Sequence, residues 1–199
     1  MSQELLAAFA LFAAVTLFTP GPNNLMLMAS GLNWGALRTL PHLSGVAIGF
    51  GIMVLLVGLG LGRVFQTWPA LYAVLKWIGA LYLVYLAWQI AIAGPVEGNG
   101  MSGARPMTFL QAALFQWVNP KAWVMAVGAV SAYGALAPFP WNVALMAAIF
   151  LGLGIVSSGA WTLFGQALQR LLTRPRSVRV FNVTMAILLV ASLAPLAWE

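Results

Sequence analysis

The sequence predicts an all-α integral membrane protein with six transmembrane helices, arranged as two inverted three-helix repeats in which helices one and four are broken. Three observations support this prediction. Only 6% of the 199 residues are charged, whereas about a quarter are charged in soluble domains. Hydrophobic runs recur at lengths that suit a membrane span of ~20 residues. Helix-breaking residues fall at matching places in the two halves of the chain.

Six hydrophobic runs define the expected spans of a single transmembrane domain, 1–199. The first run carries no basic flank and is longer than a secretory signal, so we expect it to remain as a span. The first repeat covers about 1–95 and the second about 105–199. The runs lie at roughly 5–29, 43–62, 70–93, 107–131, 140–164 and 180–198.

The distribution of arginine predicts the orientation. Turn-forming, charged segments at 30–42, 94–106 and 169–179 follow runs one, three and five, and they hold six arginines. The opposite side has only Arg63 and Lys76. Basic loops remain in the cytoplasm, so both termini are predicted to be extracytoplasmic. Because the basic residues sit at the ends of spans, the net charge of +6 does not indicate a nucleic-acid partner. The six arginines of the charged segments are Arg38, Arg105, Arg170, Arg174, Arg176 and Arg179.

The first and fourth runs are each interrupted a little past their middle, by FTPGPNN at 18–24 and FQWVNPK at 115–121. Proline removes a backbone donor and clashes with the preceding turn, so both helices should break there. Pro22 and Pro120 suit the first position of a new helix, and Asn119 suits its N-cap. Matching breaks in inverted repeats indicate a substrate site near the bilayer midplane.

The bland alternative is that these residues only shape the helices. Glycine and proline are common in membrane helices, and small residues let helices pack closely without any transport role. Runs two and five each carry a glycine series. It is the pairing of two breaks, each joined to asparagine, that favours a transporter. The glycines are Gly45, Gly49, Gly51, Gly152, Gly154 and Gly159.

A broken membrane helix exposes polar backbone that needs partners. The new helix beginning after each break presents free N–H groups, which suit a carboxylate. The carbonyls released before the break suit an ammonium group. The two breaks together therefore predict a receptor for a zwitterion.

Lys121 lies inside the fourth run, where an ionisable group is costly and indicates function. It could anchor a substrate carboxylate, carry a proton, or simply snorkel or cap helix carbonyls. The chain has no Asp, and Glu4, Glu97 and Glu199 all lie at span ends or in loops. A cavity without carboxylates disfavours dicationic substrates and favours neutral amino acids.

The sequence predicts no catalytic residue, no metal site and no cofactor. One His, no Asp and no Cys make an enzyme a poor fit. His42 is expected to be interfacial, with proton carriage as the alternative, and Ser157 and Ser158 are expected to pack helices. The candidate substrate-binding and translocation residues are Pro20, Gly21, Pro22, Asn23, Asn24, Gln116, Asn119, Pro120 and Lys121.

TPGPNN at 19–24, the glycine-rich second run and VNPKAW at 118–123 resemble the LysE/RhtB family of bacterial amino-acid exporters. The branch that handles cysteine, O-acetylserine, homoserine, threonine or leucine-like solutes looks nearest. The resemblance covers essentially the whole chain. It implies a multi-pass protein of the bacterial plasma (inner) membrane that exports amino acids, driven by protons. It also implies that Pro20, Gly21, Pro22, Asn119, Pro120 and Lys121 matter.

The leading interpretation is a secondary transporter that exports small, mainly neutral zwitterionic amino acids or derivatives by proton antiport with alternating access. The alternatives are a non-transporting membrane subunit or scaffold and a passive channel. The sequence does not identify the amino acid or the coupling ion. It also leaves the oligomeric state open, and a homo-oligomer is possible.

Overall fold

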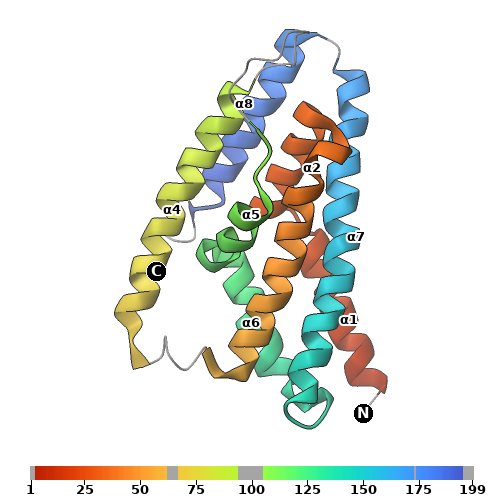
Figure 1. The fold of residues 1–199 in the computed structure, drawn as a ribbon, viewed down its shortest axis with the longest axis vertical. Coiled ribbons are helices and arrows are strands. Elements are labelled where there is room, and N and C mark those ends of the chain that lie inside the picture. The colour runs from red at the N-terminus through yellow and green to blue at the C-terminus, as the bar shows by residue number, and fades with distance from the viewer. Residues whose placement is uncertain (1–2, 62–66, 94–104, 173, 195–199) are drawn as a thin grey trace.

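The computed structural model describes residues 3–61, 67–93, 105–172 and 174–194, and in these ranges the chain is helical without strands (Figure 1). The all-α prediction is therefore confirmed for this part of the chain. Arg63, Glu97 and Glu199 fall outside it. The helices are α1 (Gln3–Phe18), α2 (Pro22–Leu56), α4 (Pro69–Ile92), α5 (Phe109–Phe115), α6 (Pro120–Tyr133), α7 (Trp141–Leu171) and α8 (Pro175–Ala191), with short turns η1 (Val57–Leu61), η2 (Gln116–Val118) and η3 (Gly134–Leu136).

By length and composition, three helical stretches among the described residues are long and apolar enough to cross a bilayer. They are Pro22–Leu61, Ala73–Ile92 and Trp141–Leu171. Gln3–Phe18 and Phe109–Val118 are shorter apolar helices. The length and composition of these helices support the prediction that the protein resides in a membrane. The division into six spans stays a prediction.

Helix α2 contains one residue with non-helical backbone, Gly35, whose φ of 77° lies in the left-handed region that favours glycine. The chain folds back on itself there. Contacts with α7 first move toward its C-terminal end and then return toward its start. In chain order they pair Gly31 with Thr162, Ala36 with Gln166, Ala47 with Gly154 and Gly58 with Val143.

The linkers expected at 30–42 and 169–179 are wrong, because helix occupies most of both intervals. Helix continues on both sides of Gly35, and only residues 172–174 separate α7 from α8. The reason is that a hydrophobic run marks only the lipid-facing part of a helix. Polar and basic residues continue the same helix beyond it, as Arg170 does at the end of α7.

Two glycines of α2 bring it into backbone contact with α5. A Cβ at Gly49 would lie 2.5 Å from the Cα of Ala113, and one at Gly45 would collide with the carbonyl oxygen of Phe109. Gly152, by contrast, has no neighbouring atom within 4 Å. Small residues thus permit close packing at some positions of the glycine series and do nothing comparable at others.

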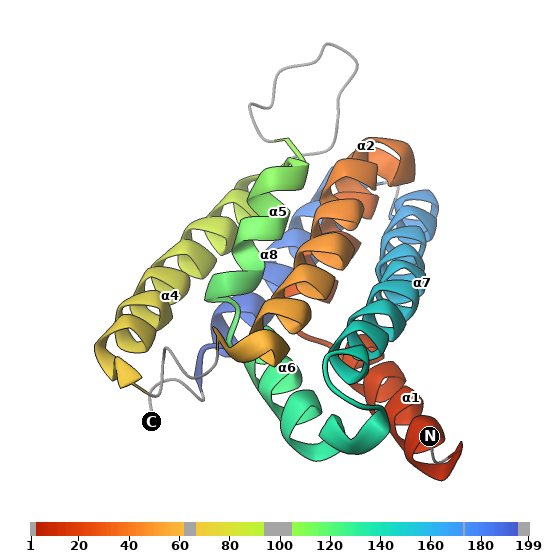
Figure 2. The same cartoon turned by 60° about the horizontal axis from the view of Figure 1, so that its bottom comes forward.

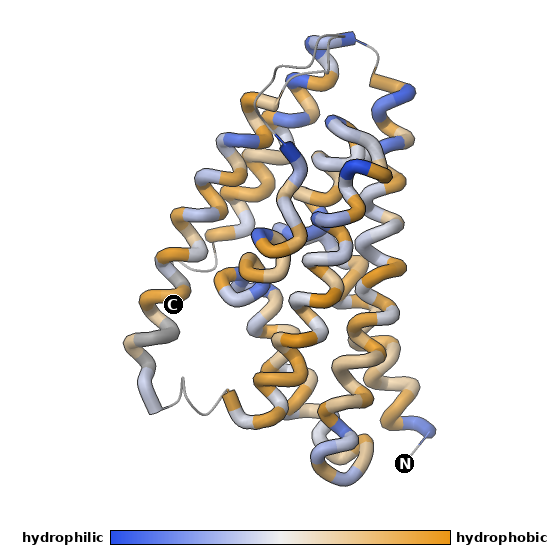
Figure 3. The backbone as a smooth tube through the Cα atoms, viewed as in Figure 1, coloured by the Kyte–Doolittle hydropathy of each residue, from blue (hydrophilic) through white to orange (hydrophobic). Residues whose placement is uncertain are grey.

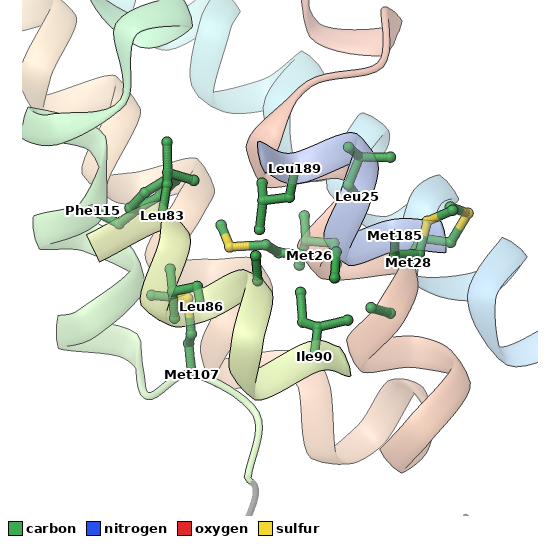
Figure 4. Close-up of a cluster of buried hydrophobic side chains, with 14 of the residues drawn as sticks. Leu25, Met26, Met28, Leu83, Leu86, Ile90, Met107, Phe115, Met185 and Leu189 are labelled. Carbon is green, nitrogen blue, oxygen red and sulfur yellow. The ribbon is translucent and has the colours of Figure 1, made fainter. Parts of the chain in front are cut away.

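Two hydrophobic clusters fill the molecule. One joins α2, α4, α5 and α8, and includes Leu25, Leu83 and Leu189 (Figure 4). The other surrounds Phe150, whose ring meets those of Phe9 and Phe50 at centroid distances of 5.2 and 5.1 Å. Seen in Figure 2, α4 and α8 flank one side of the bundle, and α1 and α7 the other.

Buried amides fasten the helices near the Gly35 turn. The side chains of Asn33 and Asn182 exchange hydrogen bonds of 2.9 and 3.0 Å, and Asn182 Nδ2 also donates to the carbonyl oxygen of Ala93, 2.7 Å away. These bonds tie α2, α8 and the end of α4 together. Hydrophilic residues gather at the same end of the molecule, around the α7–α8 junction, whereas the middle is mainly hydrophobic (Figure 3).

Candidate functional site

The two helix breaks predicted from sequence lie against each other, although about a hundred residues separate them. Residues 19–21 separate α1 from α2, and Asn119 separates η2 from α6. Lys121 bridges them. Its Nζ donates to the carbonyl oxygen of Thr19 at 2.6 Å and lies 3.4 Å from that of Pro20. The predicted helix starts at Pro22 and Pro120 are confirmed.

Side chains satisfy the carbonyls that the first break releases. The oxygen of Leu17 accepts from Asn24 Nδ2 at 2.8 Å and from Ser157 Oγ at 2.9 Å. The oxygen of Thr19 accepts from Asn24 Nδ2 at 2.9 Å as well as from Lys121. No helical N–H of the described residues bonds these two carbonyls. Polar side chains of α2, α6 and α7 satisfy them instead and so stabilise the break.

The second break is built in a similar way. Asn119 Oδ1 accepts from the backbone N–H of Lys121 at 3.2 Å, which confirms it as the N-cap of α6. The indole Nε1 of Trp123 donates to the carbonyl oxygen of Trp117 at 2.8 Å. Trp123 thus contacts the released backbone, a role that its position in the sequence did not indicate.

A pair of amides joins the breaks on another side. Asn23 Nδ2 donates to Gln116 Oε1 at 2.8 Å, and Gln116 Nε2 donates back to Asn23 Oδ1 at 3.2 Å. Gln116 also donates to the carbonyl oxygen of Ala112 at 2.8 Å and is fully buried. Its side chain orients Asn23 and does not itself line the cavity.

A cavity of about 30 Å³ lies between the two breaks. Of the nine residues predicted for the site, it is lined by Gly21, Asn23, Asn24, Asn119 and Lys121. Pro20, Pro22, Gln116 and Pro120 shape the breaks around it and stay outside its wall. Among the described residues that line this cavity, none is acidic and Lys121 is the only basic one, so its ammonium group is the only formal charge there.

Three hydroxyl groups at the cavity were not among the predicted site residues. Thr16, Ser157 and Ser158 line it, and the Ser157 hydroxyl binds the first break directly. The sequence predicted helix packing for the two serines. The available signal was that the two serines lie within the glycine series of the fifth run, between Gly154 and Gly159.

The chain is similar over almost its whole length to known proteins. The family described as LysE type translocator matches residues 14–194. Proteins named "Cysteine/O-acetylserine efflux protein" from Escherichia coli (strain K12) and Shigella sonnei (strain Ss046) are each 32% identical over 193 residues, covering 96% of this chain and 96% of their own length. No solved structure matches. A match over nearly the whole chain includes both helix breaks and the lysine between them, so the chain belongs to the LysE type translocator family.

Proposed function

We propose that this translocator is a secondary transporter that exports small, mainly neutral zwitterionic amino acids or their derivatives from the cytoplasm. It works by alternating access and proton antiport, with six spans in two inverted repeats and both termini outside the cytoplasm. The efflux proteins that it resembles are named for cysteine and O-acetylserine, which are small amino acids of this class.

The observation that carries the proposal is the ammonium group of Lys121 resting on the carbonyls of the first break. A site that holds an alkylammonium ion has the acceptors that the ammonium group of an amino acid requires. Lys121 and the start of α2, which no side chain caps, supply donors for the carboxylate, whereas Asn119 caps the start of α6. Both ends of a zwitterion therefore find complementary groups in one cavity.

The lining of the cavity supports a neutral substrate side chain. Its charged group is a cation, and its other polar groups are hydroxyls and amides. A second positive charge on the substrate would meet Lys121 without any carboxylate to offset the repulsion. Lysine and arginine are therefore poor substrates in this proposal, and serine-like and homoserine-like solutes are good ones.

The size of the cavity supports alternating access. About 30 Å³ holds one or two water molecules, which is too little for even a small amino acid. Binding then requires the two breaks to separate, and the bond from Lys121 to Thr19 is the contact that must open. In Figure 1, α4 and α8 run in opposite directions, as the inverted repeats of this proposal require of their third helices.

Proton coupling falls to few groups. The chain contains no Asp, and its three Glu residues lie near the chain ends or at position 97. Lys121 in the fourth hydrophobic run and His42 just before the second are the groups that remain as candidate proton carriers. In antiport, the carrier group takes up a proton from outside as substrate leaves and releases it into the cytoplasm before substrate binds again, which would couple the two movements at one site.

An efflux screen tests the proposed function. Cells with and without the protein are loaded with dipeptides of alanine, serine, homoserine or lysine, and the amino acids released into the medium are measured over time. We expect faster release of serine and homoserine, saturating with internal concentration and slowed by a protonophore. Export restricted to lysine would contradict the proposed selectivity. Release that neither saturates nor responds to the protonophore would indicate a channel.

Gly21→Ala is expected to slow export because its new methyl group displaces Lys121. The backbone of Gly21 is extended, with φ of −173°, so any residue can adopt it without strain. A Cβ there would lie 2.7 Å from Cδ and 3.1 Å from Nζ of Lys121. The flexible lysine gives way and loses its carbonyl partners. We expect the export rate to fall about tenfold, the effect of losing one charged hydrogen bond.

The matched control for Gly21→Ala is Gly152→Ala, where nothing lies within 4 Å. Equal amounts of both variants in the membrane, established by immunoblot, make the rates comparable. If Gly21→Ala exports at the wild-type rate, the contact between Lys121 and the first break does not matter for transport.

A further inference from the structure

A second and larger cavity lies between α2, α4 and the segment that leads into α5. It measures about 310 Å³, within the range of small-ligand sites, and shares no lining residue with the cavity at Lys121. Part of its wall is apolar and comes from three separate segments of the chain. Figure 4 shows the residues of this wall: Met26, Leu86, Ile90 and Met107.

A buried polar pair stands in the same cavity wall. His42 is 1% exposed, so the expectation of an interfacial residue is wrong. Its Nδ1 lies 3.0 Å from Ser30 Oγ, and both residues belong to the cavity lining. Its Nε2 is buried and has no hydrogen-bond partner in the described part of the chain. A buried imidazole nitrogen without a partner is costly and calls for a polar ligand or water.

Arginine supplies the charge of this cavity. Among the described residues that line it, Arg105 is the one with a formal charge, and it belongs to the arginine-rich loops. The remaining polar groups of the lining are neutral: Ser30, Gln89, Thr108 and Gln111, with the hydroxyls of Tyr82 and Tyr85. A cation surrounded by neutral donors and acceptors, with apolar walls, suits a small molecule that bears one carboxylate.

We infer that this cavity is a loading site, where a small neutral amino acid binds through its carboxylate to Arg105 before it reaches Lys121. The inference rests on the proposed export function and adds a second, earlier site to it. The loading site offers room for an amino acid in the conformation in which the Lys121 cavity is too small for one. It lies at the arginine-rich end, which the positive-inside rule assigns to the cytoplasm, the side from which an exporter loads.

The natural absence of cysteine allows a direct binding test. A single cysteine replaces Gln89, which lines the cavity, and the rate of labelling by N-ethylmaleimide is followed on the purified protein. We expect O-acetylserine to slow this labelling severalfold, and its methyl ester, which lacks the carboxylate charge, to leave the rate unchanged. Adding Lys121→Met should preserve the protection, whereas adding Arg105→Gln should remove it.

Ser44→Cys provides the matched control, because Ser44 lies in α2 but lines neither cavity. Its labelling should not respond to O-acetylserine. If Gln89→Cys is labelled at the same rate with and without O-acetylserine, or if the methyl ester protects equally, the loading site is refuted.

A transport measurement separates this inference from the proposed function. Arg105→Gln should raise the half-saturating internal concentration for export about tenfold, or ~1.4 kcal/mol, with little change in the maximal rate. Arg176→Gln, which removes an exposed arginine outside both cavities, should change neither value. Export by the wild type with no effect of Arg105→Gln would overturn the loading site alone. Protection of Gln89→Cys without any export would instead overturn the proposed function and leave the binding site standing.

Discussion

Replacing Lys121 with alanine is expected to reduce amino-acid export to the background rate while the protein remains folded in the membrane. Among the described residues, Lys121 has the only positive charge that lines the cavity, and its side chain alone connects α6 to the carbonyls of Thr19 and Pro20. Hydrogen bonds to charged groups contribute about 1.5–3 kcal/mol, so loss of the partner for the substrate carboxylate lowers the rate by about ten- to a hundredfold.

Lys121→Met distinguishes charge from volume, since methionine fills similar space without an ammonium group. We expect it to be as inactive as Lys121→Ala. Release of homoserine from dipeptide-loaded cells measures the activity, and size-exclusion chromatography in detergent checks that each variant is folded. Wild-type export by Lys121→Met would show that transport does not need the ammonium group, and that Lys121 has no role as a carboxylate anchor or proton carrier.

Gly165→Ala is expected to cost more stability than any other single glycine substitution in α7. A Cβ at Gly165 would collide with the carbonyl oxygen of Met28, and Gly31 meets the carbonyl of Thr162 in the same way on the facing helix. Both obstacles are backbone, so neither can rotate aside, and α2 and α7 must move apart. Overpacking of this kind costs about 3 kcal/mol, which lowers the melting temperature by about 6–12 °C in a chain of this size.

Gly152→Ala in the same helix predicts a change of the opposite sign. Nothing lies within 4 Å of its Cβ position, and alanine is the better helix former by about 1 kcal/mol. Thermal unfolding of both variants in one detergent, followed by the fraction that stays monodisperse after heating, gives the comparison. Equal melting temperatures for the two would mean that α2 and α7 do not meet at Gly31 and Gly165.

Local chemistry made the helix breaks predictable. Proline lacks a backbone donor and fixes its own φ, so Pro22 and Pro120 start helices wherever the chain goes afterwards. Asn119 caps α6 through its own side chain, a contact made within two residues. Such features depend on neighbours in sequence, and the sequence contains them in full.

Hydropathy was a weaker guide to where helices end. The run ending at 29 and the run beginning at 43 left thirteen residues between them, yet helix fills that interval except at Gly35. Hydrophobicity reports contact with lipid, whereas helix formation continues through polar residues that cap or face the interface. The position of the turn depends on a backbone angle that glycine alone accepts readily.

The partners of the polar residues came only from the tertiary structure. Lys121 was predicted to have a functional role, but the sequence left open whether it anchors a carboxylate or carries a proton, with snorkelling or capping of helix carbonyls as the less favoured alternative. The contact with Thr19 joins positions 102 apart, and that of Ser157 with Leu17 joins positions 140 apart. No periodicity in the chain encodes which of the many available carbonyls an ammonium or hydroxyl group will find.

The sequence by itself determined that this protein belongs in a bilayer, that its first and fourth hydrophobic runs break, and that a lysine lies at the second break. These features are predictable because the hydrophobicity of a segment and the effect of proline on its helix depend on that segment alone. Only the tertiary structure decided that the two breaks share one cavity, that hydroxyls of α7 complete it, and that Arg105 and His42 meet at a second cavity. Those features depend on helix packing, in which glycines such as Gly31 and Gly165 set how closely distant segments approach.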